Sequence, residues 1–141
     1  MDNNRIARAT VRINAPSERV WNALVDPNAI KQYMFGADVV SDWREGSPIV
    51  WKGEWQGKPY EDKGVILEFT PPQTLSYSHF SPLAGLPDVP ENYHTVRIGL
   101  SVEADQTQVT RTQDNNATVA AREESEQNWA TMLMALKKFL S

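Results

Sequence analysis

The order in which apolar spacing changes along this chain constrains its fold more than any single motif. Apolar residues alternate over residues 5–13, take helical spacing to residue 33, alternate again over residues 39–113, and return to helical spacing from about residue 117. Alternation is typical of half-buried strands, whereas recurrence at three and four residues is typical of amphipathic helices. We therefore expect a strand, two short helices, about six further strands and one long C-terminal helix.

Each expected strand is an alternating run that ends at a turn signal such as Gly-Lys-Pro or Pro-Pro. The strands are expected at residues 5–13, 39–43, 47–55, 60–69, 75–80, 93–102 and 107–113. Neighbouring strands that are joined by short turns must run antiparallel. The clearest inner row is expected to contain His94, Val96, Ile98, Leu100 and Val102.

Proline and aspartate mark the ends of the two short helices. Pro16 suits a first helical turn, and Asp26 both ends the first helix, before Pro27, and can cap the second. The final helix has a polar first half and one apolar stripe, formed by Trp129, Met132, Leu133, Leu136, Phe139 and Leu140. A single apolar stripe requires that this helix lie across the sheet, so the expected fold class is α+β.

Composition excludes several classes of protein. The 141 residues fit a single domain, residues 1–141, with 40% hydrophobic and 23% charged residues. No cysteine is present, which excludes disulfides, thiolate metal sites and cysteine catalysis. The net charge of −4 argues against nucleic-acid binding. No apolar run is long enough to span a membrane or to form a signal peptide, so we expect a cytoplasmic protein.

Several stretches of sequence resemble the START-like (SRPBCC) superfamily. They are Ile-Asn-Ala-Pro-Ser-Glu-Arg-Val-Trp-Asn-Ala-Leu at residues 13–24, Asp-Pro at 26–27, Tyr-Met-Phe-Gly at 33–36, Asp-Trp-Arg-Glu-Gly-Ser at 42–47, Gly-Val-Ile-Leu-Glu-Phe-Thr-Pro-Pro-Gln-Thr-Leu-Ser-Tyr at 64–77 and Asn-Trp at 128–129, followed by Met-Leu at 132–133. The closer likeness is to the family named for the activator of the heat-shock-protein-90 ATPase. The resemblance implies a helix-grip fold, as in birch-pollen-allergen-like proteins: a curved antiparallel sheet of about six to seven strands wrapped around the C-terminal helix.

The helix-grip resemblance also implies a cavity between the sheet, the short helices and the final helix. Apolar pockets with a few polar groups are the usual ligand sites of proteins. The candidate cavity residues are Tyr33, Phe35, Trp51, Trp55, Tyr60, Tyr77, His79, His94, Val96, Arg111 and Trp129. Any one ring can instead fill the core, but we expect at least two of the rings to face the cavity.

The two histidines, His79 and His94, end adjacent strands on either side of the loop at residues 81–92. They are expected to lie near each other, either as polar anchors or an acid–base group at the cavity mouth, or as ordinary histidines bonded to backbone or water. The loop itself can act as a lid or cover the sheet edge. Because no well-spaced carboxylate accompanies the histidines, we do not expect a metal site. We expect no other cofactor.

Charged side chains near the expected cavity allow two interpretations. By alternation Arg111 shares a face with Val109, so it either points inward, where it can bind an anionic head group, or lies on the outer face. Glu54, Glu61 and Asp62 flank a turn and are expected in solvent.

Three functions follow, in order of preference. The first is the binding of a small hydrophobic or aromatic molecule in the cavity. The second is a co-chaperone-like surface interaction, with a chaperone as partner and a role in the stress response. The third is a cyclase- or hydrolase-type enzyme using His79 or His94, but no nucleophile motif is present and no catalytic residue is assigned. A monomer and a homodimer both remain open.

Overall fold

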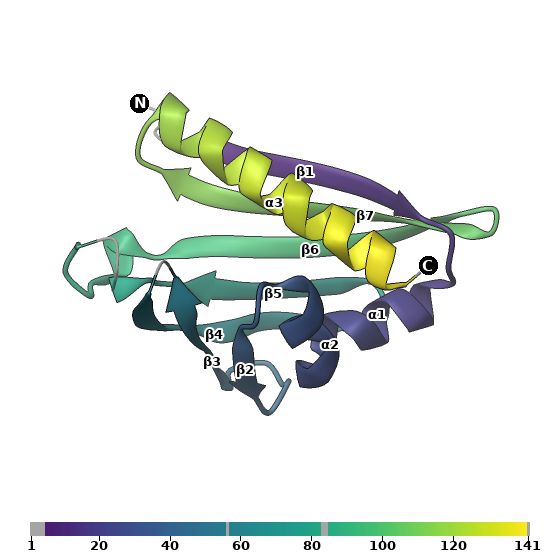
Figure 1. The fold of residues 1–141 in the computed structure, drawn as a ribbon, viewed down its shortest axis with the longest axis horizontal. Coiled ribbons are helices and arrows are strands. Elements are labelled where there is room, and N and C mark those ends of the chain that lie inside the picture. The colour runs from purple at the N-terminus through teal and green to yellow at the C-terminus, as the bar shows by residue number, and fades with distance from the viewer. Residues whose placement is uncertain (1–4, 56, 83–84, 141) are drawn as a thin grey trace.

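Within residues 5–55, 57–82 and 85–140, which the computed structural model describes, seven strands form one antiparallel sheet in the order β1-β7-β6-β5-β4-β3-β2 (Figure 1). The strands are β1 (Arg5–Ile13), β2 (Asp38–Ser41), β3 (Pro48–Trp55), β4 (Lys58–Thr70), β5 (Thr74–His79), β6 (His94–Glu103) and β7 (Gln106–Asn116). Every neighbouring pair runs antiparallel, as the short turns predict.

Three α-helices accompany this sheet in the described part of the chain: α1 (Ser17–Val25), α2 (Pro27–Tyr33) and α3 (Val119–Phe139). A short 3-10 helix, η2 (Pro90–Asn92), precedes β6. The expected cap of α2 is confirmed, because the Asn28 amide donates to Asp26 Oδ1 over 3.0 Å. The α3 helix begins in the same way, with the Ala121 amide donating to Thr118 Oγ1 over 3.0 Å.

The α3 helix lies diagonally across the sheet, and α1 and α2 lie beside its C-terminal end (Figure 1). It packs chiefly against β1, with further contacts to β7 and α2. Three residues of its stripe, Met132, Leu133 and Leu136, are fully buried against inward residues of the sheet such as Val96 and Val109. This arrangement is the helix-grip fold that the resemblance implies.

Two residues of the expected inner rows are exposed. Val102 is 61% exposed, because the β6–β7 hairpin extends past the end of α3 (Figure 1). Phe139 is 43% exposed at the side of the α3 stripe, where its ring centroid lies 6.3 Å from that of Tyr33. Period-two and helical spacing identify a face but not where the opposing element ends, so both predictions of burial were wrong.

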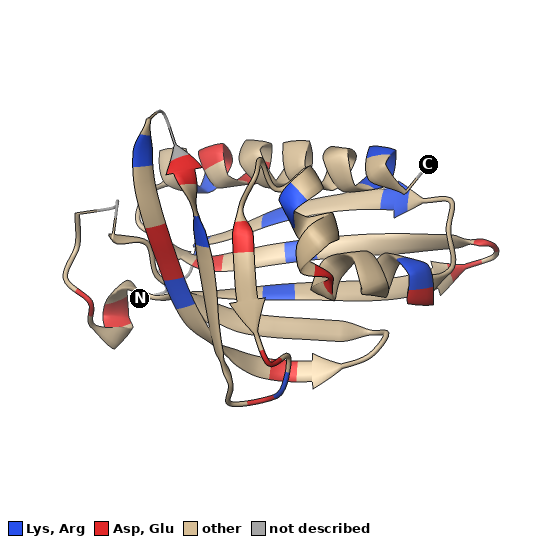
Figure 2. Ribbon diagram, turned by 60° about the horizontal axis from the view of Figure 1, so that its bottom comes forward, with Lys and Arg blue, Asp and Glu red and all other residues tan. Residues whose placement is uncertain are grey.

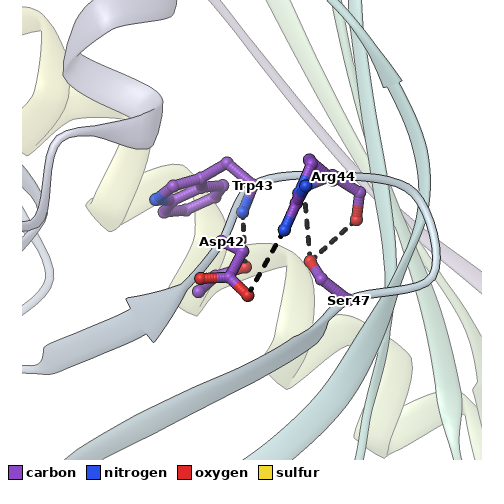
Figure 3. Close-up of polar contacts among 5 residues, drawn as sticks. Asp42, Trp43, Arg44 and Ser47 are labelled. Carbon is purple, nitrogen blue, oxygen red and sulfur yellow. Dashed lines mark hydrogen bonds and ion pairs between the residues drawn. The ribbon is translucent and has the colours of Figure 1, made fainter.

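The strand expected at residues 39–43 is shorter in the structure, because β2 ends at Ser41 and the residues after it form the turn to β3. Trp43 has a positive φ of 56°, and its amide donates to Ser41 Oγ over 3.0 Å (Figure 3). Ser47 Oγ donates to the Arg44 carbonyl over 2.7 Å, and Arg44 pairs with Asp42 over 3.9 Å. These local bonds hold a conformation in which the Trp43 side chain packs against the core.

Basic and acidic residues are interspersed over the strands and helices (Figure 2). None of the helices in the described ranges has both the length and the apolarity needed to cross a membrane.

Candidate ligand-binding pocket

A pocket of about 550 Å³ lies between the sheet, α3 and the segment that follows α2. Strands β3, β4, β5 and β7 supply one wall, and the second half of α3 supplies the other. The lining residues are Met34, Phe35, Ala37, Trp51, Glu54, Tyr60, Asp62, Tyr77, His79, Ser81, Arg111, Asn128, Trp129, Thr131 and Met132. The pocket thus combines aromatic and apolar walls with a few charged groups.

The structure brings most of the candidate residues to this pocket. Those that line it are Phe35, Trp51, Tyr60, Tyr77, His79, Arg111 and Trp129. Val96 is buried in the core, and neither it nor His94 is among the lining residues. The side chain of Trp55 lies outside the part that the structure describes.

Tyr33, another candidate cavity residue, is not among the residues that line this pocket. Its hydroxyl donates to the Ala23 carbonyl over 2.9 Å, and burial raises the pKa of Tyr33 far above its ordinary value. It lines a small void of about 20 Å³, which also touches Trp43, Trp51 and Arg111. That volume is close to the space that one water needs.

Aromatic rings from neighbouring strands form the floor of the pocket. The ring centroid of Trp51 on β3 lies 5.0 Å from that of Tyr77 and 5.0 Å from that of His79, both on β5. Alternation places these residues on the inner face together with Ile49 and Leu75, which are buried. The Trp51 ring is tilted by 48° from the Tyr77 ring and by 64° from the His79 ring, so the floor presents ring faces and edges against which an aromatic molecule can pack.

Gly53 makes room for Tyr60 at the edge of the pocket. The two residues are opposite each other in the β3–β4 register, and a Cβ atom on Gly53 would lie 2.6 Å from the Tyr60 hydroxyl oxygen. Burial raises the pKa of Tyr60, and the nearby charges of Asp62 and Asp38 raise it further. The Tyr60 phenol therefore remains a neutral hydrogen-bond donor at physiological pH.

Asp62 and His79 form a bonded pair in the wall of the pocket. His79 Nε2 donates to Asp62 Oδ2 over 2.9 Å, and the two side chains are only 21% and 15% exposed, respectively. The other carboxylate oxygen, Oδ1, is buried without a hydrogen-bond partner. The carboxylate fixes the orientation of the imidazole.

The expectation that Asp62 lies in solvent was therefore wrong. Tyr60, Asp62, Gly64 and Ile66 alternate along the inner row of β4, and Ile66 is fully buried. Counting by twos from Ile66 would have identified Asp62 from the sequence. Glu54 is exposed as expected, although it also reaches the pocket lining.

The expected proximity of the two histidines is confirmed. His79 and His94 are partners in the β5–β6 register, and their ring centroids are 6.4 Å apart. His94 Nδ1 donates to the Asp114 carbonyl over 2.8 Å, so its ring is bonded to backbone. Of the two, only His79 reaches the pocket lining.

Arg111 points inward from β7 and is 3% exposed. Its guanidinium carbon lies 3.6 Å from the centroid of the Trp129 ring and 6.0 Å from that of the Tyr77 ring. Neither Arg111 Nε nor Trp129 Nε1 has a hydrogen-bond partner.

The loop at residues 81–92 is attached to the sheet edge through Asp88. Asp88 forms an ion pair with Lys63, and the Tyr93 hydroxyl donates to Asp88 Oδ1 over 2.7 Å. Ser81, at the start of the loop, lines the pocket. Leu83 lies outside the described residues, and a role of this loop as a lid stays a prediction.

Sequence reasoning missed several lining residues besides Asp62. Met34 follows α2, and Thr131 and Met132 lie on the pocket side of α3. Met132 belongs to the recognised apolar stripe, but spacing alone does not show which part of a stripe faces a cavity. Among the described residues, no group of three or more His, Asp or Glu side chains could hold a metal ion.

Comparison with known families gives a match over most of the chain. The family model described as activator of Hsp90 ATPase homolog 1-like protein matches residues 14–141. A comparison with curated proteins found no match.

Solved structures show the same fold. A Cytophaga hutchinsonii protein is 61% identical, with a TM-score of 0.84 over 96% of this chain and 92% of that chain. CalU16 from Micromonospora echinospora is 25% identical, with a TM-score of 0.74 over 98% of this chain and 85% of that one. The Aha1 dimer from Colwellia psychrerythraea is 22% identical, with a TM-score of 0.74 over 96% and 95% of the two chains.

Proposed function

The chain belongs to the family of activator of Hsp90 ATPase homolog 1-like proteins, and we propose that it binds a small apolar or aromatic molecule in the pocket between α3 and the sheet. The observation that carries this proposal is the aromatic pocket of about 550 Å³. Ligand pockets of proteins commonly measure about 300–1,000 Å³ and combine apolar walls with a few polar groups.

The polar atoms of the pocket support the same proposal. Buried polar groups in folded proteins are almost always hydrogen-bonded. Here Asp62 Oδ1, Arg111 Nε and Trp129 Nε1 are buried without a protein partner. Asp62, Arg111 and Trp129 all line the pocket, so a ligand bound there would lie against these residues and against the rings of Trp51 and Tyr77.

A co-chaperone-like role through the surface is the second candidate, and the family description favours it. The two functions make different predictions for the pocket. Binding of a chaperone through the surface would be unaffected by a side chain that blocks the pocket, whereas ligand binding would be lost.

Native mass spectrometry of the purified protein tests the proposal directly. We expect a co-purified or added small aromatic molecule to remain bound under gentle desolvation and to be lost on denaturation. Thr131→Trp places a large side chain at the pocket from an exposed position of α3 and should abolish binding. Met134→Trp is the matched control, because Met134 is exposed on α3 and is not a lining residue. Equal binding by the two variants would rule out this pocket as the site.

A further inference from the structure

Arg111 brings a positive charge to the pocket, and no described carboxylate beside it balances that charge. Arg111 lies in the inner row of β7 with Val109 and Gln113, and all three are buried. Its guanidinium carbon lies over the Trp129 ring, 3.6 Å from the centroid. Although Arg111 is only 3% exposed, it is among the residues that line the pocket.

No carboxylate of the described residues forms an ion pair with Arg111. Other arginines that the structure describes do form ion pairs. Arg12 pairs with Glu103, and Arg97 pairs with Glu68, each over 2.9 Å. Those pairs are largely exposed, where a cation is stable even alone. Arg111, the buried arginine among the described residues, thus has no anionic partner, although burial makes such a partner more stabilising than it would be at the surface.

Stacking compensates only part of the cost of this burial. An aromatic ring attracts a guanidinium through its π face, but it accepts no hydrogen bond in the plane of the guanidinium. Buried charges in proteins are normally paired with an opposite charge. Because Arg111 lines the pocket without an ion pair, the part of its guanidinium that borders the pocket is suited to an oxyanion, which this planar fork can bind through two hydrogen bonds.

We propose that the ligand of this pocket is an organic anion, with a flat apolar body on the floor of Trp51 and Tyr77 and an oxyanion bound to the guanidinium of Arg111. This inference rests on the proposed function and adds the chemical class of the ligand. Glu54 and Asp62 also line the pocket, but they lie on β3 and β4, and β5 and β6 separate β4 from β7. The anionic end of the ligand therefore lies at Arg111, and its uncharged end lies toward Asp62.

Two fluorescent probes of nearly the same shape test this inference. 8-Anilinonaphthalene-1-sulfonate carries a sulfonate, and N-phenyl-1-naphthylamine is the same framework without it. We expect the wild-type protein to bind the anionic probe at least tenfold more tightly than the neutral probe. Arg111→Met should weaken binding of the anionic probe at least tenfold and change that of the neutral probe by less than threefold. The loss expected from Arg111→Met corresponds to about 1.4 kcal/mol or more.

Arg97→Met is the control for charge, because it removes one exposed arginine from the outer face of β6. It should leave the affinities for both probes unchanged. Thr131→Trp should abolish binding of both probes, which shows that they occupy the pocket. If Arg111→Met fails to fold, the comparison of the two probes on the wild-type protein still decides the question.

Each outcome separates the inference from the proposed function. Equal affinities of the wild-type protein for the two probes, or equal losses of both in Arg111→Met, would overturn the anion site and leave the ligand pocket intact. Tight binding of the neutral probe alone would do the same. Failure of both probes to bind would overturn the proposed function itself.

Discussion

At the residue scale, buried polar side chains show which contacts hold the fold. Thr107 is fully buried at the start of β7, and its hydroxyl donates to the Ala15 carbonyl over 2.8 Å. This bond joins β7 to the segment between β1 and α1, which is otherwise irregular backbone. If a buried carbonyl loses its hydrogen-bond donor, its desolvation free energy is no longer offset by a hydrogen bond, and the fold is destabilised.

We expect Thr107→Val to lower the free energy of unfolding by about 1–3 kcal/mol, because valine has the same shape but leaves the Ala15 carbonyl unsatisfied. Urea denaturation of the two proteins measures the difference. Thr10→Val, at an exposed position of β1, should change stability by less than about 0.5 kcal/mol. A similar loss in both variants would indicate that the effect is not due to the buried bond.

Gly53 provides a second prediction at this scale. An alanine at this position would place its Cβ atom against the Tyr60 ring, so we expect Gly53→Ala to move that ring toward solvent. Because burial is the main cause of the raised pKa of Tyr60, the variant should return this pKa toward its ordinary value. NMR titration of ¹³C-labelled tyrosine measures it. Gly99→Ala is the control, since a Cβ atom there meets nothing within 4 Å; an unchanged Tyr60 pKa in Gly53→Ala would contradict the steric argument.

At the scale of the elements, the sequence predicted each strand and α-helix, though not the 3-10 helix η2, because local periodicity reports which face is buried. Residues 39–43 show the limit of this method, since bonds within the turn place Trp43 outside the strand. Asp62 shows a second limit of the method. Alternation along β4 predicts its inward position, but it cannot predict its bond to His79, which lies on a different strand. Contacts between elements require the sheet order, which no single element contains.

The loop at residues 81–92 has a pH dependence that follows from its attachment. Hydrogen bonds from Lys63 and then from Tyr93 lower the pKa of Asp88. A carboxyl group with a lowered pKa contributes its stabilisation fully above its ordinary value of 3.8 and loses it as the pH falls through the lower, folded-state value. We therefore expect the loop to stay attached at neutral pH and to detach only in acid, below about pH 3.8.

Asp88→Asn should loosen the loop already at pH 7, because it removes the charge that Lys63 pairs with. NMR line widths and chemical shifts of residues 85–93 between pH 2.5 and 7 provide the measurement. The acid-induced change expected for the wild type should be absent from this variant. Asp105→Asn, in the exposed β6–β7 turn, should keep the wild-type titration; loss of the transition in both variants would refute the assignment to Asp88.

At the scale of the whole molecule, the pocket lies between α3 and part of the sheet. The α3 helix is packed chiefly against β1, whereas the pocket lies between α3 and strands β3, β4, β5 and β7. The buried residues Met132, Leu133 and Leu136 hold α3 in place without help from a ligand. A ligand in the pocket would add contacts between α3 and strands β3, β4 and β5, because both line the pocket.

Ligand binding should therefore stabilise the whole fold. A molecule that binds only the folded state at a hundred times its Kd adds about 2.7 kcal/mol to the free energy of unfolding. For a domain of this size, that gain corresponds to a rise in Tm of several degrees. We expect N-phenyl-1-naphthylamine to produce this rise in the wild type and in Met134→Trp, but not in Thr131→Trp. Because the stabilisation follows from mass action, the rise must grow with the logarithm of the probe concentration above Kd. A rise of equal size in Thr131→Trp would mean that the probe binds elsewhere and that the pocket makes no contribution to stability.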